Sequence, residues 1–477
     1  MLFNSYEFIF FFLPIVFFGY FYLTSRRLIV PSKVWLVGAS LFFYSYWHVA
    51  YLALILLSML VNFAVGNSLS LQNESRKKTL SKKSLLIIGI LFNLGLLGYF
   101  KYVDFFLENV NLLLDSSLPL PNVVLPLAIS FFTFQQISYL VDSFRQETKE
   151  YDFLNYALFV TFFPQLIAGP IVHHKEMMPQ FATSWNLVKK YRNIALGLFI
   201  FSIGLFKKVV IADTFAKWAT QGFDHMTALN LLEAWATSLS YTFQLYFDFS
   251  GYTDMAIGIA LLFNIRLPIN FNSPYKARNI QDFWRRWHIT LSRFLRDYVY
   301  VPLGGNRSGR YRTYANLFAT FLIGGLWHGA SWMFVIWGAL HGAAMVTHRL
   351  WKSLGFRMWG WLAWLTTFMF INITWVFFRA ADMADAMKVL KGMIGMGGGE
   401  LASGVTASLA RLNEYGPVAS WVVIAFLIVL LGKNSGEYMA RFKPNRNYLA
   451  ASLGLMTVGL AYLFYMNFES EFLYFNF

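Results

Sequence analysis

Two histidines in unusual surroundings, His288 and His328, are the residues of this chain best suited to chemistry. The first ends the run Phe283-Trp284-Arg285-Arg286-Trp287-His288, and the second lies in Gly324-Gly325-Leu326-Trp327-His328-Gly329. Imidazole titrates near neutral pH and can take up and return protons. An ionisable residue at membrane depth indicates a functional site. The pair therefore points to proton transfer inside a membrane.

The residue types suggest a different role for each histidine. His328 is suited to be a general base that deprotonates a hydroxyl attacking an acyl group. His288 is suited to orient that nucleophile or to stabilise the developing oxyanion. The structural alternative is a histidine that only forms hydrogen bonds between helices.

The arginines before His288 suggest how a donor is held. Guanidinium groups pair well with phosphate, so Arg285 and Arg286, with Trp284 and Trp287 beside them, are candidates for binding an anionic donor such as coenzyme A. The alternative is an interfacial helix whose arginines meet anionic lipid.

Other polar residues in apolar sequence are weaker candidates. Asp248 and Asp254 can orient an imidazole or pair with arginines, and an equally good alternative is packing and capping. His341 and His348 are seven residues apart and share a helix face, and their role stays open. Since no carboxylate stands at ligand spacing, we predict no metal site. His173, His174 and His225 are interpreted as loop histidines.

Composition indicates an integral membrane protein. Hydrophobic residues make up 57% of the 477 residues and charged residues 13%, about half the soluble average. The net charge of +15 comes from basic residues in short loops between apolar segments, which is typical of cytoplasmic loops and not of nucleic-acid binding. The chain has no cysteine, which excludes disulfides and thiolate chemistry. No nucleotide-binding, serine-hydrolase or zincin motif occurs.

The apolar segments predict about eleven transmembrane helices, at roughly 20 residues per span. Arg26 and Arg27 after the first segment place the N-terminus outside the cytoplasm. The apolar segment 194–206 is expected to end at Lys207 and Lys208. The expected apolar segments are 6–23, 34–47, 51–65, 85–100, 123–141, 154–167, 194–206, 231–249, 255–263, 314–326, 332–345, 361–377, 421–431 and 449–466.

The stretch 266–312 departs from this pattern. It holds ten Lys and Arg residues with only two acids, Asp282 and Asp297, and is still rich in aromatic residues. We expect short amphipathic or re-entrant helices at the cytoplasmic face. The whole chain, 1–477, is predicted to be one membrane-embedded domain.

Taken together, these motifs resemble the membrane-bound O-acyltransferase family, in its bacterial branch that O-acetylates exported polysaccharides such as alginate. The resemblance covers essentially the whole chain. The matching stretches are 163–170, 247–254, 270–275, 282–288, 298–306 and 326–329.

The resemblance implies an all-α protein, a ring of tilted helices around a central tunnel. It maps the invariant histidine of the family to His328 and the second active-site position to His288. Asn272 and Tyr298 lie in matching stretches and are expected to be supporting polar residues. The implied donor is acetyl-CoA, with no bound cofactor. The implied setting is the bacterial inner membrane and its lipid, with an extracytoplasmic partner protein that carries a serine nucleophile and reaches the polysaccharide.

Three alternatives stay open. The acceptor can be peptidoglycan or teichoic acid in place of alginate or cellulose. A transporter without chemistry would show coupling carboxylates and two symmetric halves, whereas here the unusual polar residues gather in one region. A scaffold for other subunits is the third.

Overall fold

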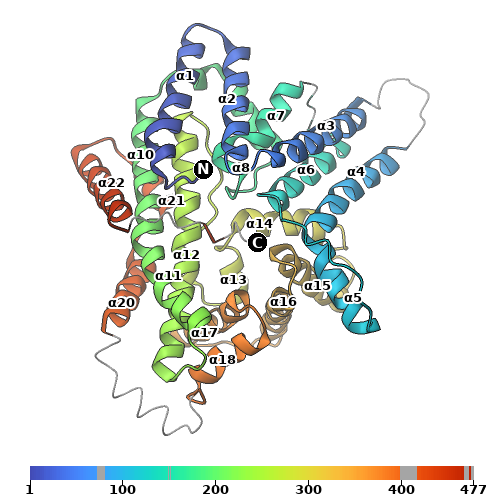
Figure 1. Ribbon diagram of the computed structural model, residues 1–477, viewed down its shortest axis with the longest axis vertical. Helices are drawn as coiled ribbons and strands as arrows, with labels where there is room; N and C mark the ends of the chain where they lie inside the picture. Colours follow the sequence, from blue (N-terminus) through green and yellow to red (C-terminus); the bar gives the residue numbers. More distant parts are fainter. Residues whose placement is uncertain (72–80, 149, 151, 398–415, 467–471, 474–477) are drawn as a thin grey trace. The chain divides into compact units, whose positions relative to one another are not determined.

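A computed structural model describes residues 1–71, 81–148, 150, 152–397, 416–466 and 472–473 (Figure 1). Within these residues the regular structure is helical and none of it is strand. The prediction of an all-α, polytopic membrane protein is confirmed. The chain divides into two compact units, each assembled from three stretches. The first comprises Met1–Ser202, Tyr252–Pro268 and Lys443–Leu453, and the second Ile203–Gly251, Ile269–Phe442 and Gly454–Phe477.

The first unit is a set of helices from the N-terminal part of the chain. Within it α1 packs on α2, and both α3 and α4 pack on α6. Its helices are η1 (Glu7–Phe12), α1 (Leu13–Ser25), α2 (Ile29–Ser45), α3 (Ala50–Leu71), α4 (Lys82–Leu97), η2 (Gly98–Tyr102), α5 (Val103–Leu114), α6 (Ile129–Phe144), α7 (Phe153–Thr161), α8 (Phe163–Leu166), α9 (His174–Ala182), η3 (Ser184–Leu187) and most of α10 (Tyr191–Leu205).

The second unit holds both candidate histidines. Its most extensive helix pair is α15 with α16, followed by α16 with α17. Its helices are η4 (Phe206–Ala212), α11 (Asp213–Thr220), η5 (Gln221–His225), most of α12 (Leu231–Leu262), η6 (Pro274–Lys276), α13 (Ile280–Trp284), α14 (Ile289–Leu295), η7 (Arg296–Tyr300), α15 (Arg310–His328), α16 (Trp332–Ser353), α17 (Gly360–Arg379), α18 (Met383–Met393), α20 (Gly416–Leu431), α21 (Ser435–Arg441) and part of α22 (Arg446–Met466).

Fewer helices than expected are long and apolar enough to cross a membrane. In the described part of the chain six meet both criteria, or seven if the bent pair α20 and α21 forms one span. These criteria rest on length and composition alone, so the number of about eleven spans stays a prediction, and some of the expected segments form shorter helices. The segment 154–167, for example, is divided between α7 and α8 at Phe162.

Two expected helix boundaries were wrong. The segments predicted as 231–249 and 255–263 form one continuous helix, α12. Lys207 and Lys208 do not end a span, because η4 continues α10 through them into α11 and η5. A lysine pair marks a helix end only if water can reach both ammonium groups, and Lys208 is 2% exposed.

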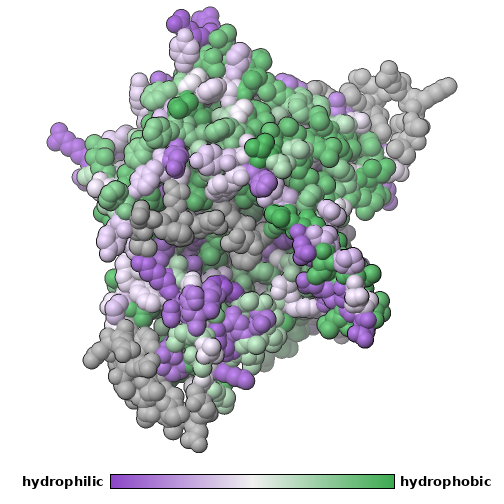
Figure 2. All heavy atoms as spheres, viewed as in Figure 1, coloured by the Kyte–Doolittle hydropathy of each residue, from purple (hydrophilic) through white to green (hydrophobic). Residues whose placement is uncertain are grey.

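The surfaces of η1 and α1 show why these helices suit lipid. Phe11, Phe18 and Tyr22 are more than half exposed, and Figure 2 shows hydrophobic side chains spread over the part of the molecule formed by the N-terminal helices. Such a run of exposed aromatic residues is unfavourable in water and favourable in a bilayer. The helices are therefore stabilised by lipid contact as well as by packing.

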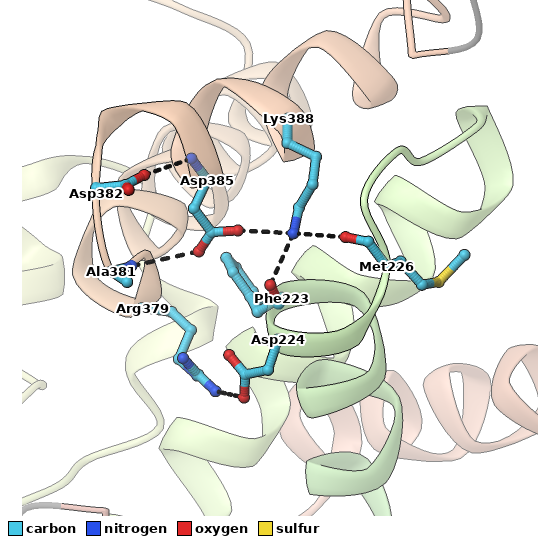
Figure 3. Close-up of polar contacts among 8 residues, drawn as sticks. All are labelled: Phe223, Asp224, Met226, Arg379, Ala381, Asp382, Asp385 and Lys388. Carbon is cyan, nitrogen blue, oxygen red and sulfur yellow. Dashed lines mark hydrogen bonds and ion pairs between the residues drawn. The ribbon is translucent and has the colours of Figure 1, made fainter.

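In the second unit, polar contacts link α18 to the end of η5 (Figure 3). The ammonium of Lys388 donates to the carbonyls of Phe223 at 2.7 Å and Met226 at 2.9 Å, and pairs with Asp385 at 2.7 Å. Carbonyls at a helix end lack intrahelical donors, so a lysine there satisfies them. Arg379, the last residue of α17, pairs with Asp224 of η5 at 2.5 Å.

Candidate active site

His288 lies at a sharp turn between two short helices. Asn279 caps α13 by accepting the Asp282 N–H at 2.8 Å, and α13 ends at Trp284. His288 then adopts the left-handed conformation, with φ of 42° and ψ of 55°, and α14 begins at Ile289. A non-glycine residue pays about 1–2 kcal/mol for this conformation, so the surrounding contacts must hold it.

Those contacts come from the preceding loop. The N–H of Asn272 donates to the carbonyl of Arg286 at 2.9 Å, and the N–H of Ile289 donates to the carbonyl of Asn270 at 3.0 Å. The loop thus pairs with the backbone on both sides of His288. The stretch around Asn270 and the stretch ending at His288 therefore form one hydrogen-bonded unit.

His328 is the last residue of α15. Gly329 follows in extended conformation, and Ser331 begins the next helix by accepting the Met333 N–H at 3.2 Å. The imidazole is 3% exposed. It lies edge-on to Trp337 of α16 and Phe378 of α17, with ring centroids 5.1 Å apart in both cases.

Close backbone approach within the hairpin of α15 and α16 sets the position of His328. A Cβ atom on Gly325 would lie 2.3 Å from the carbonyl oxygen of Phe334, and one on Gly338 would lie 2.7 Å from that of Phe321. Only glycine permits this separation. The glycines near the Trp-His-Gly motif are therefore structural.

The fold brings the two histidines to one indole. The ring of Trp327 lies 6.2 Å from that of His288 and 5.0 Å from that of His328, between ring centroids. His288 also lies edge-on to Phe249 at 4.7 Å, and it is fully buried. Two imidazoles beside one aromatic side chain, both shielded from solvent, form a site that can exchange protons away from water.

The expected donor-binding residues separate into two groups. Arg285 is exposed, and Arg286 pairs with Asp282 at 2.9 Å. Trp284 and Trp287 are 7% and 1% exposed, inside the aromatic core. Donor contact by any of the four stays a prediction, and the burial of the two indoles favours a packing role for them.

The expected supporting residues have different surroundings. Asp248 pairs with the buried ammonium of Lys208 at 2.8 Å, so its observed partner is a lysine and not an arginine. The side-chain oxygen of Asn272 accepts from Asn434 at 2.9 Å, and Tyr298 packs on Phe294. Asp254 is buried in the first unit.

His341, whose role the sequence left open, is a buried core residue. Its Nδ1 accepts the indole N–H of Trp284 at 3.1 Å, and its Nε2 lies 3.1 Å from the hydroxyl of Thr374. An indole N–H can only donate, so Nε2 carries the proton. His341 thus links α13, α16 and α17.

Sequence reasoning missed two histidine–carboxylate pairs in the first unit. His173 lies in the loop that leads into α9, as expected, whereas His174 is the first residue of that helix, and both are buried. They pair with Asp142 at 3.5 Å and Glu150 at 3.3 Å. Burial is the largest single influence on the pKa of Glu150 and tends to raise it, but the hydrogen bonds from His174, the Asp152 backbone and Asn155, with the charge of His174, together lower it. Asp142 lies 31 residues before His173 and Glu150 lies 24 residues before His174, so residue spacing gave no signal for either pair.

The chain is similar to several known proteins and to one family. The model described as MBOAT, membrane-bound O-acyltransferase family, matches residues 123–383, which include both histidines. A peptidoglycan O-acetyltransferase of Helicobacter pylori is 50% identical over 100% of this chain and 98% of its own length. A probable alginate O-acetylase AlgI of Pseudomonas aeruginosa is 40% identical over 89% and 81%. A teichoic acid D-alanyltransferase of Bacillus subtilis is 28% identical over 54% and 68%.

Proposed function

Because the chain belongs to the membrane-bound O-acyltransferase family and is a multi-pass membrane acyltransferase, we propose that it supplies acetyl groups for O-acetylation of peptidoglycan. The donor is acetyl-CoA on the cytoplasmic side of the inner membrane, and the acceptor lies outside. The N-terminus is extracytoplasmic in this arrangement. The observation that carries the proposal is the placement of His288 and His328 against one buried indole.

The choice of peptidoglycan over alginate rests on similarity. The relative named for peptidoglycan matches at 50% identity over the full chain, and the relative named for alginate at 40% over 89%. The alginate-type relatives make an exported polysaccharide the second candidate. The sequence expectation of alginate or cellulose therefore takes second place in this proposal.

The reaction needs little beyond the two imidazoles. The hydroxyl oxygen forms a bond to the acetyl carbonyl carbon, and the carbon–sulfur bond of the thioester breaks. The hydroxyl proton passes to His328 and then to the departing thiolate. Exposed Arg285 is suited to meet the donor's phosphates, and the aromatic shell around the site excludes water that would hydrolyse the thioester.

We further propose that the acetyl group leaves through a partner protein. His288 and His328 are 0% and 3% exposed, and a polymer strand is too bulky to reach such positions directly. A serine side chain presented by an extracytoplasmic partner is small enough to enter. A tunnel that joins the two membrane faces remains part of this expectation.

The test is the O-acetyl content of two polymers in the source organism. Cells lacking the gene are complemented with the wild-type chain, His328→Ala, His288→Ala or His348→Ala. Peptidoglycan and exported polysaccharide are then purified separately, and base-released acetate is measured in each. His348 is a matched control because it lies on α16, only partly buried.

We expect acetate to be lost from peptidoglycan alone in the deletion and in the His328 and His288 variants, and to be restored by His348→Ala. Loss from the exported polysaccharide alone would transfer the assignment to the second candidate. Unchanged acetate in both polymers, with membrane levels of the variants equal to wild type, would overturn the proposed function.

A further inference from the structure

Three polar groups lie within hydrogen-bond distance of the side-chain oxygen of Asn270. It lies 3.2 Å from the backbone nitrogen of Thr290, 3.0 Å from the Thr290 hydroxyl and 3.1 Å from Nδ1 of His288. Asn270 is 1% exposed and His288 is fully buried. Water therefore does not compete for these contacts.

One of the three groups settles the orientation of the amide. The backbone N–H of Thr290 can only donate, so the atom facing it must be the oxygen of Asn270 and not its NH₂ group. Since that oxygen can only accept, Nδ1 of His288 must carry a proton to form its hydrogen bond. The contact thus reports the tautomer of His288 as well as its position.

The surrounding backbone keeps this contact in place. The Ile289 N–H donates to the carbonyl of Asn270 at 3.0 Å, so Asn270 holds both the main chain and the side chain of the turn. The left-handed conformation of His288 aims its ring at that oxygen. Burial also lowers the pKa of His288 to about 3, so the imidazole is neutral near physiological pH.

We propose that Asn270 is a positioning residue that fixes His288 as the Nδ1–H tautomer, with Nε2 as the accepting nitrogen. An unprotonated Nε2 can accept the hydrogen bond of an attacking hydroxyl, and it cannot donate to an oxyanion. Of the two roles expected for His288, this leaves orientation of the nucleophile. That consequence rests on the proposed acyl transfer, whereas the tautomer itself does not.

The tautomer is measured directly by solid-state nitrogen NMR. The full chain is labelled with ¹⁵N-histidine and reconstituted in lipid, and the signals of His288 are identified by their loss in His288→Gln. We expect a protonated Nδ1 and an unprotonated Nε2 in the wild type. In Asn270→Leu, which has similar volume but no acceptor, we expect the other tautomer to appear. This readout is independent of activity.

The second measurement is the pH dependence of the rate of acetyl transfer. Asn270→Asp keeps an oxygen acceptor and adds a negative charge, which stabilises the protonated imidazole. We expect this variant to retain transfer at neutral pH, with the acidic limb of its pH profile moved upward by about 1–3 units. Asn270→Leu should lose about 10²–10⁴-fold in turnover without weaker donor binding.

Asn372→Leu is the matched control. Asn372 is also fully buried, and its bonds to Thr242 and Ser238 involve neither His288 nor His328. The Asn372→Leu variant should have lower thermal stability than the wild type. Its His288 NMR signals and the acidic limb of its pH profile should be unchanged. If Asn270→Leu does not fold, the wild-type NMR signals and the pH profile of Asn270→Asp still test the proposal.

A protonated Nε2 in the wild type, or a His288 signal that Asn270→Leu leaves unchanged, would overturn the proposal. An unmoved acidic limb in Asn270→Asp would overturn the assigned role. If the tautomer is found as expected but no acetyl transfer is detected, the proposed function fails and the positioning by Asn270 stands.

Discussion

The indole N–H of Trp284 donates to Nδ1 of His341 over 3.1 Å, and both side chains are buried. This bond joins the run that ends at His288 to the helix that packs against His328. Trp284→Phe keeps most of the ring but leaves the nitrogen of His341 without its donor, which costs about 1–3 kcal/mol.

We therefore expect Trp284→Phe to lower the thermal unfolding temperature in detergent and to leave acetyl-CoA binding unchanged. Trp359→Phe is the control, because Trp359 is 74% exposed and surface substitutions are usually within about 0.5 kcal/mol. A loss of donor affinity without a loss of stability would instead support the donor-binding role predicted for Trp284.

The buried ammonium of Lys208 should contribute more to the stability of the fold than the ammonium of Lys207. It pairs with Asp213 at 2.9 Å and Asp248 at 2.8 Å. Lys208→Met leaves these carboxylates without their shared cation, an effect of about 3–5 kcal/mol. Lys207→Met removes a bond to the Ser435 hydroxyl and should cost about 1 kcal/mol.

Thermal unfolding of both variants in detergent tests this difference. Adding Asp248→Asn to Lys208→Met should recover part of the loss, because one buried charge is removed. Equal losses in the two single lysine variants would contradict the importance of the buried cluster.

Gly325 should be intolerant of even one methyl group. A Cβ there would lie 2.3 Å from the Phe334 carbonyl, so Gly325→Ala must separate α15 from α16 and displace His328 three residues later. We expect reduced acetyl transfer together with reduced stability. Gly38→Ala, in α2, is the control, because its Cβ would meet nothing within 4 Å. Wild-type transfer by Gly325→Ala would show that the close approach is dispensable.

The polar contacts of Figure 3 should not contribute equally. The side chains of Arg379 and Asp224 are 24% and 40% exposed, and exposed ion pairs contribute about 0–1 kcal/mol. Lys388 and Asp385 are 15% and 14% exposed, and Lys388 also satisfies two carbonyls. We expect Lys388→Met to lower the unfolding temperature clearly more than Asp224→Asn. The reverse order would indicate that the exposed pair between α17 and η5 contributes more to stability than the contacts of Lys388.

Much of the architecture could be predicted because hydropathy is a local property. The apolar runs identified the helical class and the multi-pass topology. The chemistry of imidazole singled out His288 and His328. The aromatic, basic character of 266–312 indicated short helices, and α13 and α14 lie there. The predicted boundaries failed where a polar residue inside an apolar run finds a buried partner, as Lys208 does.

The sequence by itself determined which segments are apolar enough to enter a membrane and which side chains there can transfer protons. Only the tertiary structure decided that Trp327 lies beside both imidazoles. It also decided that His341 forms hydrogen bonds with Trp284 and Thr374. The contact between the Asn270 side chain and Nδ1 of His288 likewise depends on the tertiary structure. These are directional contacts between segments far apart in the chain. Their distances and donor–acceptor roles depend on how helices and turns pack, and residue order does not encode that locally.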